Sequence, residues 1–496
     1  MQLHNTFTAN KERVTAAEGG PLKLYVCGPT PYDHAHLGHA RCYVVYDVLV
    51  RHLRNSGAPV TYVRNVTDVE DKIMKRAAER GVTPMALAEE FFASYSEDMS
   101  RLGNLAPDIE PKVSEHIPDV IALIEKLVAR NHAYAAEGDV YFHVPSFAEY
   151  GKLSHRKLED MEAGASGRTE SAESARKKHP YDFALWKKSE PGQLGWDSPW
   201  GFGRPGWHIE CSAMSMRHLG ETLDVHGGGL DLVFPHHENE IAQSEAATGK
   251  TYVRHFMHNG FVQVNKEKMS KSLGNFFTAR EVFQLVEPEA VRFALLSIHY
   301  RAPFNLEWET SEAGATTFPT FVEAEKRLEY IYRTRKRLTA IPAQRVTGEA
   351  PLPAELGDYP KKLSEALEDD LNTPIAFAVT SEFLHAVNQV CDKAMAKKGK
   401  IPQNFLIAAQ AGFAALASEL AVGADEPDAF LTRVRDRKAK FLGIIPNDIE
   451  AAIEARRNAR AEKDFARADA IRGELLNKGV ELLDAADGGT SWQLAD

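Results

Sequence analysis

The sequence predicts an α/β fold: a Rossmann-like parallel sheet that is interrupted by an insertion, followed by an α-helical bundle and a small α+β unit. Three observations favour this class. A strand–helix–strand pattern opens the chain, short apolar runs typical of strands return after residue 220, and the pattern after Arg301 is helical. Alternating strands and helices are typical of parallel sheets, because each helix carries the chain back across the sheet.

The opening unit is the most regular part of the pattern. Leu22–Val26 is a short apolar run with a β-branched and an aromatic residue, which predicts a strand that ends at Gly28. From Gly38 the apolar residues recur at helical spacing until Pro59 stops the helix. Val60–Val63 is the next strand, so the unit is strand–helix–strand.

The remaining segments are expected in the following order. Two helices and a strand come next, then a loop-rich insertion with much charge, Gly, Ser and Pro, and then two strands that resume the sheet. These are expected at Met85–Met99, Val113–Arg130, Asp139–Val144, residues 151–198, Thr222–His226 and Phe256–Val264. Four bundle helices follow, with a Pro-rich linker after the first; they are expected at Phe318–Leu338, Pro360–Leu367, Asn372–Lys393 and Phe405–Leu420.

A small final unit is expected near the carboxyl end. Ile449–Asn477 shows a long charged helical pattern that Gly479 can cap, and Val480–Leu483 and Ser491–Leu494 predict two short strands. Trp492 offers a surface on which an unstacked RNA base could stack, and packing against the last helix is the equally weighted alternative.

Bulk properties exclude several classes of protein. A chain of 496 residues is longer than a single hydrophobic core usually supports, so several domains are expected. No apolar stretch approaches the ~20 residues of a membrane span, and the amino-terminal residues lack an apolar signal core. Four widely spaced cysteines favour a reducing, cytoplasmic setting. The net charge of −11 argues against indiscriminate nucleic-acid binding but leaves local basic patches open, such as the Lys and Arg residues at 326–337.

Two short motifs of a kind that handles phosphate stand far apart in the chain, His36-Leu37-Gly38-His39 and Lys268-Met269-Ser270-Lys271-Ser272. The histidines are expected where the carboxyl end of a strand passes into a helix, which favours phosphate binding. Histidines placed there can donate hydrogen bonds to phosphate oxygens in a transition state. Each motif alone also fits ordinary loop residues, but chance does not readily explain both in one chain.

A candidate metal site is spread over three segments. Cys27 directly follows the first strand, Cys211 stands much later, and His236 and Glu240 are four positions apart, so that one helix face can present both. Such mixed sulfur, nitrogen and oxygen ligands suit Zn²⁺. His237 with Glu240 is the alternative pair. The scattered spacing by itself also fits four unconnected residues.

The two phosphate motifs, in this order, resemble the signatures of class I aminoacyl-tRNA synthetases, and nearly the whole chain resembles the cysteinyl-tRNA synthetase family. The departures are Leu37, where isoleucine is usual, and a weakly matching tail after Leu483. The segments that carry the resemblance are Leu3–Thr6, Tyr25–Thr30, Tyr32–His39, Arg64–Asp68, Asp71–Ile73, Tyr150–Ser154, Trp186–Lys187, Gly206–Ser212, His226–Asp231, Phe234–Glu240, Met269–Asn275 and Asp369–Pro374.

The resemblance implies a reaction in two steps: cysteine and ATP, with Mg²⁺, give cysteinyl-adenylate, and the cysteinyl group then passes to the 3′ end of tRNA(Cys). It implies one zinc ion per chain, with an open position for the substrate thiolate that serine cannot match. It also assigns roles to residues of this sequence. The metal ligands would be Cys27, Cys211, His236 and Glu240; the catalytic residues His36, His39, Lys268 and Lys271, with His36, His39 and Lys271 on ATP; and the substrate-binding residues Thr67, Trp207 and Asp231.

The same resemblance divides the chain into parts, with a monomer expected. They are the first half of the catalytic domain at 1–130, a connective insertion at 131–205, the second half at 206–265, the Lys268–Ser272 loop with a stem-contact region at 266–310, a tRNA-binding helical bundle at 311–446 and an anticodon-recognition domain at 447–496. Two alternatives stay open at this point: a cysteine ligase of mycothiol synthesis, which joins cysteine to an amino sugar, and a non-catalytic RNA-binding relative. The long helical continuation argues against the first, and the intact motifs argue against the second.

Overall fold

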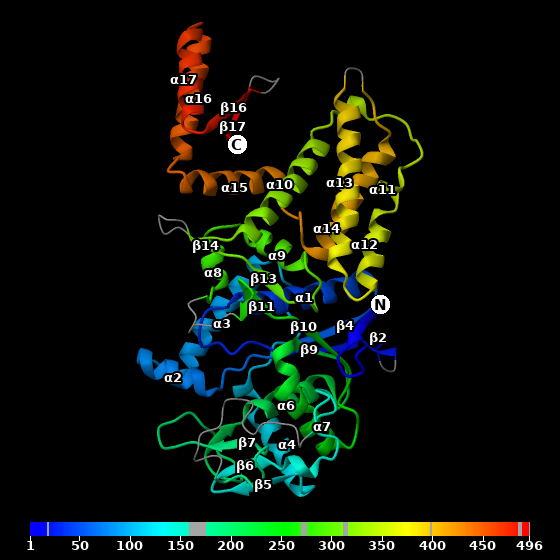
Figure 1. The fold of residues 1–496 in the computed structure, drawn as a ribbon, viewed down its shortest axis with the longest axis vertical. Helices are drawn as coiled ribbons and strands as arrows, with labels where there is room; N and C mark the ends of the chain where they lie inside the picture. The colour runs from blue at the N-terminus through cyan, green and yellow to red at the C-terminus, as the bar shows by residue number, and fades with distance from the viewer. Residues whose placement is uncertain are drawn as a thin grey trace.

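The computed structural model of the protein describes residues 1–16, 19–157, 175–268, 275–310, 316–396, 399–484 and 489–495. Figure 1 shows an elongated molecule with a parallel sheet near its middle, an antiparallel sheet with helices at one end, and long helices at the other. Among the described residues, none of the helices combines the length and the apolar composition that a membrane span requires.

Four parallel strands form the central sheet, as expected. Along the sheet they follow the order β10-β9-β3-β4, with Leu24 paired to Tyr62 on one side and to Val225 on the other. The chain therefore adds strands first on one side of β3 and later on the other. This reversal opens a crevice at the carboxyl ends of the strands, where ligands of such sheets bind. The strands are β3 (Leu22–Val26), β4 (Val60–Arg64), β9 (Leu223–Gly229) and β10 (Val253–Asn259).

Helix α1 (Leu37–Asn55) crosses between the first two strands, and 14 of its 19 residues are buried. The sheet covers it on one side and helices from the second half of the chain cover it on the other, which explains why buried residues lie on more than one of its faces. The helices that follow in this half are α2 (Asp71–Arg80) and α3 (Pro84–Arg101).

The segment at 151–198, which was expected to be rich in loops, contains one strand at Phe183–Lys188; its other described residues form no helix or strand. This strand belongs to an antiparallel four-stranded sheet, and α4, α6 and α7 pack beside that sheet in a core of its own. The expected helix at Val113–Arg130 instead starts at Ile117, after a short turn, because Pro118 stands at the start of a helix, where its missing N–H costs nothing. The elements are α4 (Ile117–Ala129), β5 (Ala133–Ala136), β6 (Asp139–Phe142), β7 (Phe183–Lys188), β8 (Gly203–Pro205), α6 (Trp207–Leu219) and α7 (Glu238–Thr248).

The expected single strand at Phe256–Val264 was wrong in extent. β10 ends at Asn259 and a separate strand starts at Val262. Gly260 stands at the break, where a Cβ atom would lie 2.5 Å from the carbonyl oxygen of Ala302. The first half of the chain also contains two short strands at its amino end, β1 (Gln2–Asn5) and β2 (Asn10–Arg13). The elements between β10 and the bundle are β11 (Val262–Val264), β12 (Glu267–Lys268), α8 (Ala279–Val282), α9 (Pro288–Leu296), β13 (Phe304–Leu306), β14 (Glu309–Thr310) and β15 (Thr316–Thr317).

The helical bundle contains the four expected helices, together with α11 and α15, which were not expected. It packs against α1 through α14 and against α9 through α10. Its core is continuous with that of the parallel sheet, so the two halves share one apolar interior. The helices are α10 (Pro319–Thr339), α11 (Ala354–Gly357), α12 (Tyr359–Glu368), α13 (Thr373–Met395), α14 (Gln403–Leu420) and α15 (Pro427–Phe441).

The final unit contains two helices rather than the expected single one. α16 (Pro446–Ala461) and α17 (Phe465–Asn477) are separated at Lys463, whose φ of 63° no helix allows. Gly479 takes the expected left-handed conformation after α17. The two predicted strands form the hairpin of β16 (Val480–Asp484) and β17 (Thr490–Leu494).

Trp492 packs inside this final unit, which supports packing over base stacking, the two alternatives that the sequence left equally weighted. Its side chain is 3% exposed and belongs to a core with Leu475 and Leu482. Its indole N–H donates to Glu450 Oε1 at 2.8 Å, and the Arg435 guanidinium covers the ring at 4.0 Å. An RNA base has no access to this ring in the folded unit.

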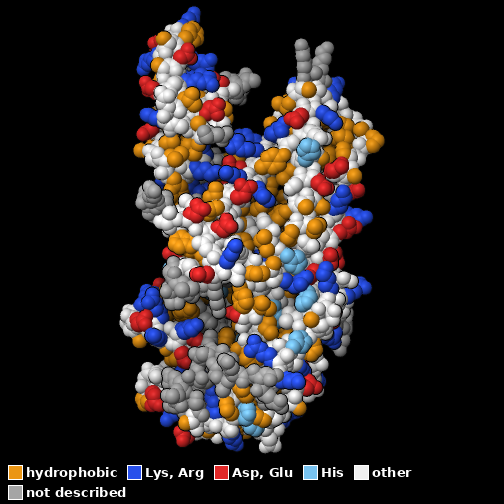
Figure 2. All heavy atoms as spheres, in the orientation of Figure 1, with side chains coloured by type: hydrophobic (Ala, Val, Ile, Leu, Met, Phe, Trp, Pro, Cys, Tyr) orange, Lys and Arg blue, Asp and Glu red, His pale blue; other side chains and the backbone are white. Residues whose placement is uncertain are grey.

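Most cations of the basic helix α10 are paired, so its charge does not by itself form a patch. Arg333 faces Glu329, Arg337 lies against Asp392, and Arg335 donates to backbone carbonyl groups ahead of α15. Figure 2 shows the same mixture, with Asp and Glu side chains beside the Lys and Arg side chains where α10 and α15 meet.

Candidate active site and metal centre

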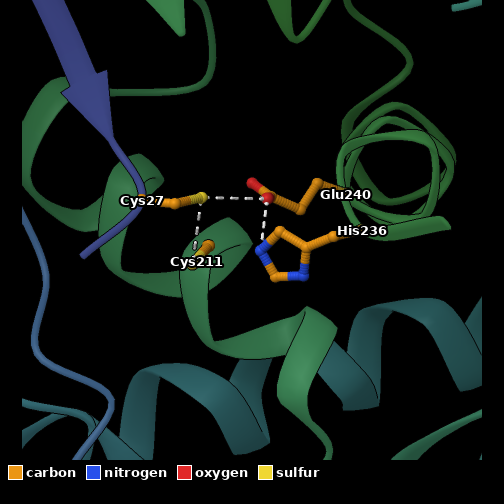
Figure 3. Close-up of side chains that lie close together, drawn as sticks. All are labelled: Cys27, Cys211, His236 and Glu240. Atoms are coloured by element: carbon orange, nitrogen blue, oxygen red, sulfur yellow. Dashed lines mark hydrogen bonds and ion pairs between the residues drawn. The ribbon is translucent and has the colours of Figure 1, made fainter. Parts of the chain in front are cut away.

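The candidate metal ligands meet at the carboxyl end of the central sheet. Cys27 directly follows β3, Cys211 lies on α6, and Glu240 lies on the first turn of α7, with His236 just ahead of that helix. Three segments that are far apart in the sequence therefore converge on the crevice beside β3 (Figure 3). All four side chains are buried.

Their ligand atoms lie close enough to share one ion. The two Sγ atoms are 3.8 Å apart, Cys27 Sγ is 3.7 Å from Glu240 Oε1, and His236 Nε2 is 2.9 Å from the same oxygen. One ligand atom from each of the four residues lies within 4.8 Å of the others. This separation matches four ligands around a tetrahedral ion, whose bonds are about 2.0–2.3 Å long.

Glu240 is oriented by groups behind it. Its Oε2 lies 3.0 Å from His226 Nε2 and accepts a hydrogen bond from Tyr252 Oη, also at 3.0 Å. The other nitrogen of His226 lies 3.0 Å from the carbonyl oxygen of Tyr25, which supports the ring in turn. Because Oε2 is occupied in this way, Oε1 faces Cys27 and His236.

Electrostatics favour charged ligands in this buried place. Burial raises the pKa of Glu240, but His226 and His236 outweigh it and hold that pKa well below its usual range. The Cys27 thiol lowers the pKa of Cys211 to about 6, with a contribution from His236 and against the effect of burial. Burial and Cys211 together raise the pKa of Cys27. The pair therefore tends to carry one thiolate even without a cation.

His237, the alternative ligand, belongs to a second group of side chains. Its Nε2 lies 3.3 Å from Cys27 Sγ but 4.0 Å from Glu240 Oε1, and its Nδ1 lies 2.8 Å from His258 Nε2. With His226 it completes another close set of four around Cys27 and Glu240. His236 is nearer to the carboxylate, and the set that contains it is the one that includes Cys211. Burial lowers the pKa of His237 strongly, so its ring is neutral at pH 7.

The two motif histidines stand at the amino end of α1. His36 caps the helix, because its Nδ1 accepts from the backbone N–H groups of Gly38 and His39 at 3.0 and 3.3 Å. The His39 ring stacks on the His36 ring at 3.8 Å between centroids. Burial lowers the pKa of His39 to about 4, so the ring is neutral at pH 7 and can donate one N–H without a charge.

The second motif is described only at its first residue. The backbone of Lys268 lies in β12, which pairs with β11, whereas Lys271 lies outside the described residues. The segment that follows returns to the first motif: the Leu37 N–H donates to the carbonyl oxygen of Phe277 at 3.4 Å, and the Ala279 N–H donates to that of Ala35 at 2.8 Å. Backbone contacts thus join the segment after the second motif to the first motif.

The three candidate substrate residues lie in different surroundings with respect to the candidate metal ligands. Trp207 begins α6, and its ring stacks on the His236 ring at 4.1 Å. Thr67 is buried after β4, and its N–H donates to the carbonyl oxygen of Pro29 at 3.0 Å. Asp231 is exposed on the turn after β9. Trp207 and Thr67 therefore border the segments that hold the ligands.

Sequence reasoning missed several residues that hold this site together. Asn65 Oδ1 accepts from the Gly28 N–H at 2.8 Å, and Asn65 Nδ2 donates to Thr67 Oγ1 at 3.1 Å. His208 Nδ1 lies 3.0 Å from His236 Nδ1. Both residues stand inside segments that carry the family resemblance, which was the only available signal. Their side-chain directions depend on how α6 and β4 pack.

Comparisons with known proteins agree with this site. The model of the family described as tRNA synthetases class I (C) catalytic domain matches residues 13–315. Solved structures of the methionyl-tRNA synthetase of Mycobacterium tuberculosis (14% identical, TM-score 0.59, covering 86% of this chain and 94% of that one) and the LeuRS of Agrobacterium radiobacter K84 (12% identical, TM-score 0.56, covering 84% and 86%) share the fold. The chain is therefore a class I aminoacyl-tRNA synthetase, and so an enzyme of the ligase class.

Relatives with higher sequence identity show which family of class I synthetases the chain belongs to. The cysteine–tRNA ligase of Anaeromyxobacter dehalogenans is 49% identical over 100% of this chain and 99% of its own length. That of Geobacter sulfurreducens is 48% identical over the same shares of both chains. The chain belongs to the cysteine–tRNA ligase family. The alternative of a mycothiol-pathway ligase is not favoured, because these relatives match from end to end.

Proposed function

We propose that this chain activates L-cysteine with ATP and transfers it to tRNA(Cys), and that Cys27, Cys211, His236 and Glu240 hold one zinc ion. The observation that carries the proposal is the convergence of these four buried ligand atoms within 4.8 Å, with Cys27 directly after the carboxyl end of β3. Two sulfurs, one nitrogen and one oxygen form a donor set that fits Zn²⁺. When bound, the zinc supplies a soft, positively charged position for the thiolate of the substrate cysteine.

The chain's own residues would place the two reacting groups. Trp207 and Thr67, which border the segments that hold the candidate ligands, would form walls around the amino acid. The carboxylate of Asp231, on the turn after β9, has the right charge to receive the substrate ammonium group. His36 and His39 at the amino end of α1 would bind ATP phosphates, where the helix dipole also favours negative charge. The reaction then depends on holding the cysteine carboxylate in line with the α-phosphorus.

Lys268 and Lys271 would neutralise charge on the leaving pyrophosphate. The support comes from their motif and from the backbone contacts that bring the residues after this loop back to His36. Mg²⁺ would accompany the ATP phosphates, since carboxylates and phosphates are its usual partners.

The helical bundle at 311–446 and the unit at 447–496 would bind tRNA. The support is their position: Figure 1 shows both extending away from the sheet, and Figure 2 shows an open space between them at that end of the molecule. Family membership supports a cytoplasmic setting, and we propose that the enzyme acts as a monomer.

Metal analysis tests the zinc site directly. Protein purified without added zinc should hold about one equivalent per chain, and Cys211→Ala should lower this sharply, because three ligands hold the ion less well than four. Cys391→Ala is the matched control, since Cys391 is also buried but lies on α13 of the bundle. Full zinc retention in Cys211→Ala would remove Cys211 from the ligand set.

His236→Ala and His237→Ala then decide between the two histidines. We expect His236→Ala to lose zinc and His237→Ala to keep most of it, because only His236 Nε2 lies within 3 Å of Glu240 Oε1. The reverse result would assign the ion to the set that contains His226 and His237.

A further inference from the structure

The loop between α12 and α13 places a carboxylate in a buried position that the reaction chemistry does not use. Asp370 is fully buried, and its Oδ1 accepts from the His4 N–H at 2.8 Å and from Tyr300 Oη at 2.7 Å. Its Oδ2 accepts from Arg301 Nε and Nη2 at 3.0 and 2.7 Å. One side chain of the bundle thus binds two separate segments of the catalytic half.

The backbone of this loop is held in an uncommon conformation. Asp370 and Leu371 have φ values of 62° and 47°, in the left-handed region that side chains other than glycine rarely adopt. Such conformations persist where surrounding contacts determine them. Here the Asp370 N–H donates to the carbonyl oxygen of Gln2 at 2.9 Å, and Thr373 Oγ1 donates to that of Leu296 at 2.5 Å.

The turn that binds Asp370 is itself bound by the helix of the first motif. Arg41 is fully buried on α1, two positions after His39. Its guanidinium donates to the carbonyl oxygens of Leu295, of Ile298 at 3.2 Å and of His299 at 2.9 Å. The path from the amino end of α1 to the bundle therefore runs through two charge-assisted contacts, which are stronger and more directional than neutral ones. The Arg41 guanidinium is buried, whereas Arg301 is partly exposed and reaches the buried Asp370 carboxylate.

We propose that the Asp370 joint, formed by Arg41, Tyr300, Arg301 and Asp370, is a positioning device that sets the angle of the bundle to the active site. The proposal rests on the proposed function, in which the bundle binds tRNA. Asp370 does not touch the reacting atoms; it acts through α12 and α13, the two helices that it joins.

A small change of angle at the Asp370 joint would move the far end of α13 by several ångströms. α13 begins three residues after Asp370 and has 23 residues, so it is roughly 35 Å long. A tilt of about 5° at its base would move its far end by roughly 3 Å. A misplacement of about 1 Å at reacting groups can lower a rate on the order of 100-fold. The transfer step needs the tRNA end at the adenylate, whereas the activation step needs no tRNA.

The test compares the two steps in Asp370→Asn, which keeps the shape of the side chain but replaces one acceptor with an N–H donor. Cysteine-dependent pyrophosphate exchange should stay within about two-fold of wild type. The rate of transfer from preformed adenylate to saturating tRNA should fall about ten-fold or more. Asp369→Asn is the matched control, because that neighbouring carboxylate is exposed and pairs only with Lys11 among the described contacts; both steps should be unchanged.

Tyr300→Phe gives a milder variant of the same joint. It removes one donor to Asp370 Oδ1 and should lower the transfer rate in the same direction, with exchange retained. Undiminished transfer in Asp370→Asn would overturn the proposal. So would an equal loss of both steps together with a lower melting temperature in both variants, since that pattern indicates a general folding role.

Hydrogen exchange of the wild type with and without tRNA separates this proposal from its premise. Protection of α10 to α14 by tRNA supports the role of the bundle, and the variants then test the joint alone. If tRNA protects none of these helices, the premise fails and the joint cannot act in the way proposed.

Discussion

Glu240 shows how single atoms within one residue take different tasks. One oxygen is held from behind by His226 and Tyr252, and the other faces Cys27 and His236. This arrangement is typical of carboxylates that bind metals, because partners behind a ligand fix its direction. The same atoms also explain why the side chain stays charged although it is fully buried, since the neighbouring imidazoles hold its pKa low.

Lys271→Ala provides a prediction at the same scale. If its ammonium group stabilises the leaving pyrophosphate, the variant should lower cysteine-dependent pyrophosphate exchange on the order of 10²–10³-fold. Cysteine binding, measured by calorimetry, should be largely kept, because the proposed cysteine site lies around Cys27 and Trp207. Lys250→Ala is the control, since Lys250 is exposed and paired with Glu221. An unchanged exchange rate in Lys271→Ala would mean that the lysine has another role.

At the scale of helices and strands, ion pairs and hydrogen bonds between elements determine which charged side chains stay available to a partner. Helix α10 carries many cations, yet their partners lie on its own face and on α13 and the segment ahead of α15. Arg456, in the final unit, is buried against Asp484 at 2.7 Å. Basic side chains that the sequence offered for RNA binding are therefore paired with acidic side chains or backbone carbonyl groups within the fold.

Trp492→Ala tests packing at this scale. Removing a large buried ring typically costs about 3–5 kcal/mol, so the final unit should unfold at a lower temperature and become sensitive to protease. Trp492→Phe should lose less, because it keeps most of the ring volume and gives up the hydrogen bond to Glu450. A Trp492→Ala enzyme with full stability and weakened tRNA binding would instead restore base stacking as its role.

For the whole molecule, the final unit packs apart from the region that holds the candidate metal ligands. α16, α17, β16 and β17 pack on one another around their own core and contact the rest of the described chain chiefly through α15. The candidate ligands and the first motif lie on the central sheet, α6, α7 and α1. Under the proposed function, activation would depend on that region, and transfer would depend on it together with the final unit.

Removal of residues 447–496 should expose this division. We expect cysteine-dependent pyrophosphate exchange to stay near wild type, because none of the candidate ligands or motif histidines is touched. Aminoacylation should lose efficiency through a higher KM for tRNA. A folded truncation that charges tRNA with unchanged efficiency would exclude this unit from tRNA recognition. Circular dichroism and a melting curve should show that residues 1–446 remain folded in the truncated protein and melt as they do in the full chain.

The sequence alone determined the class of fold, the opening strand–helix–strand unit, four helices of the bundle, and the chemical types at the candidate site. These properties follow from local patterns: apolar spacing specifies helices and strands, and Cys27, Cys211, His236 and Glu240 are visible as residue types. The boundary between α16 and α17 and the break at Gly260 were not predictable, because they depend on backbone conformation and on close approach of distant segments.

Only the tertiary structure decided which residues meet. It brought Cys211 to 3.8 Å from Cys27 across 184 positions, buried Trp492, and placed Asp370 on Tyr300 and Arg301. The physical reason is that such contacts depend on the packing of whole elements, which buries side chains and satisfies their polar groups together. A linear pattern carries no distance between segments, so it can name the ligands of a site but not their arrangement.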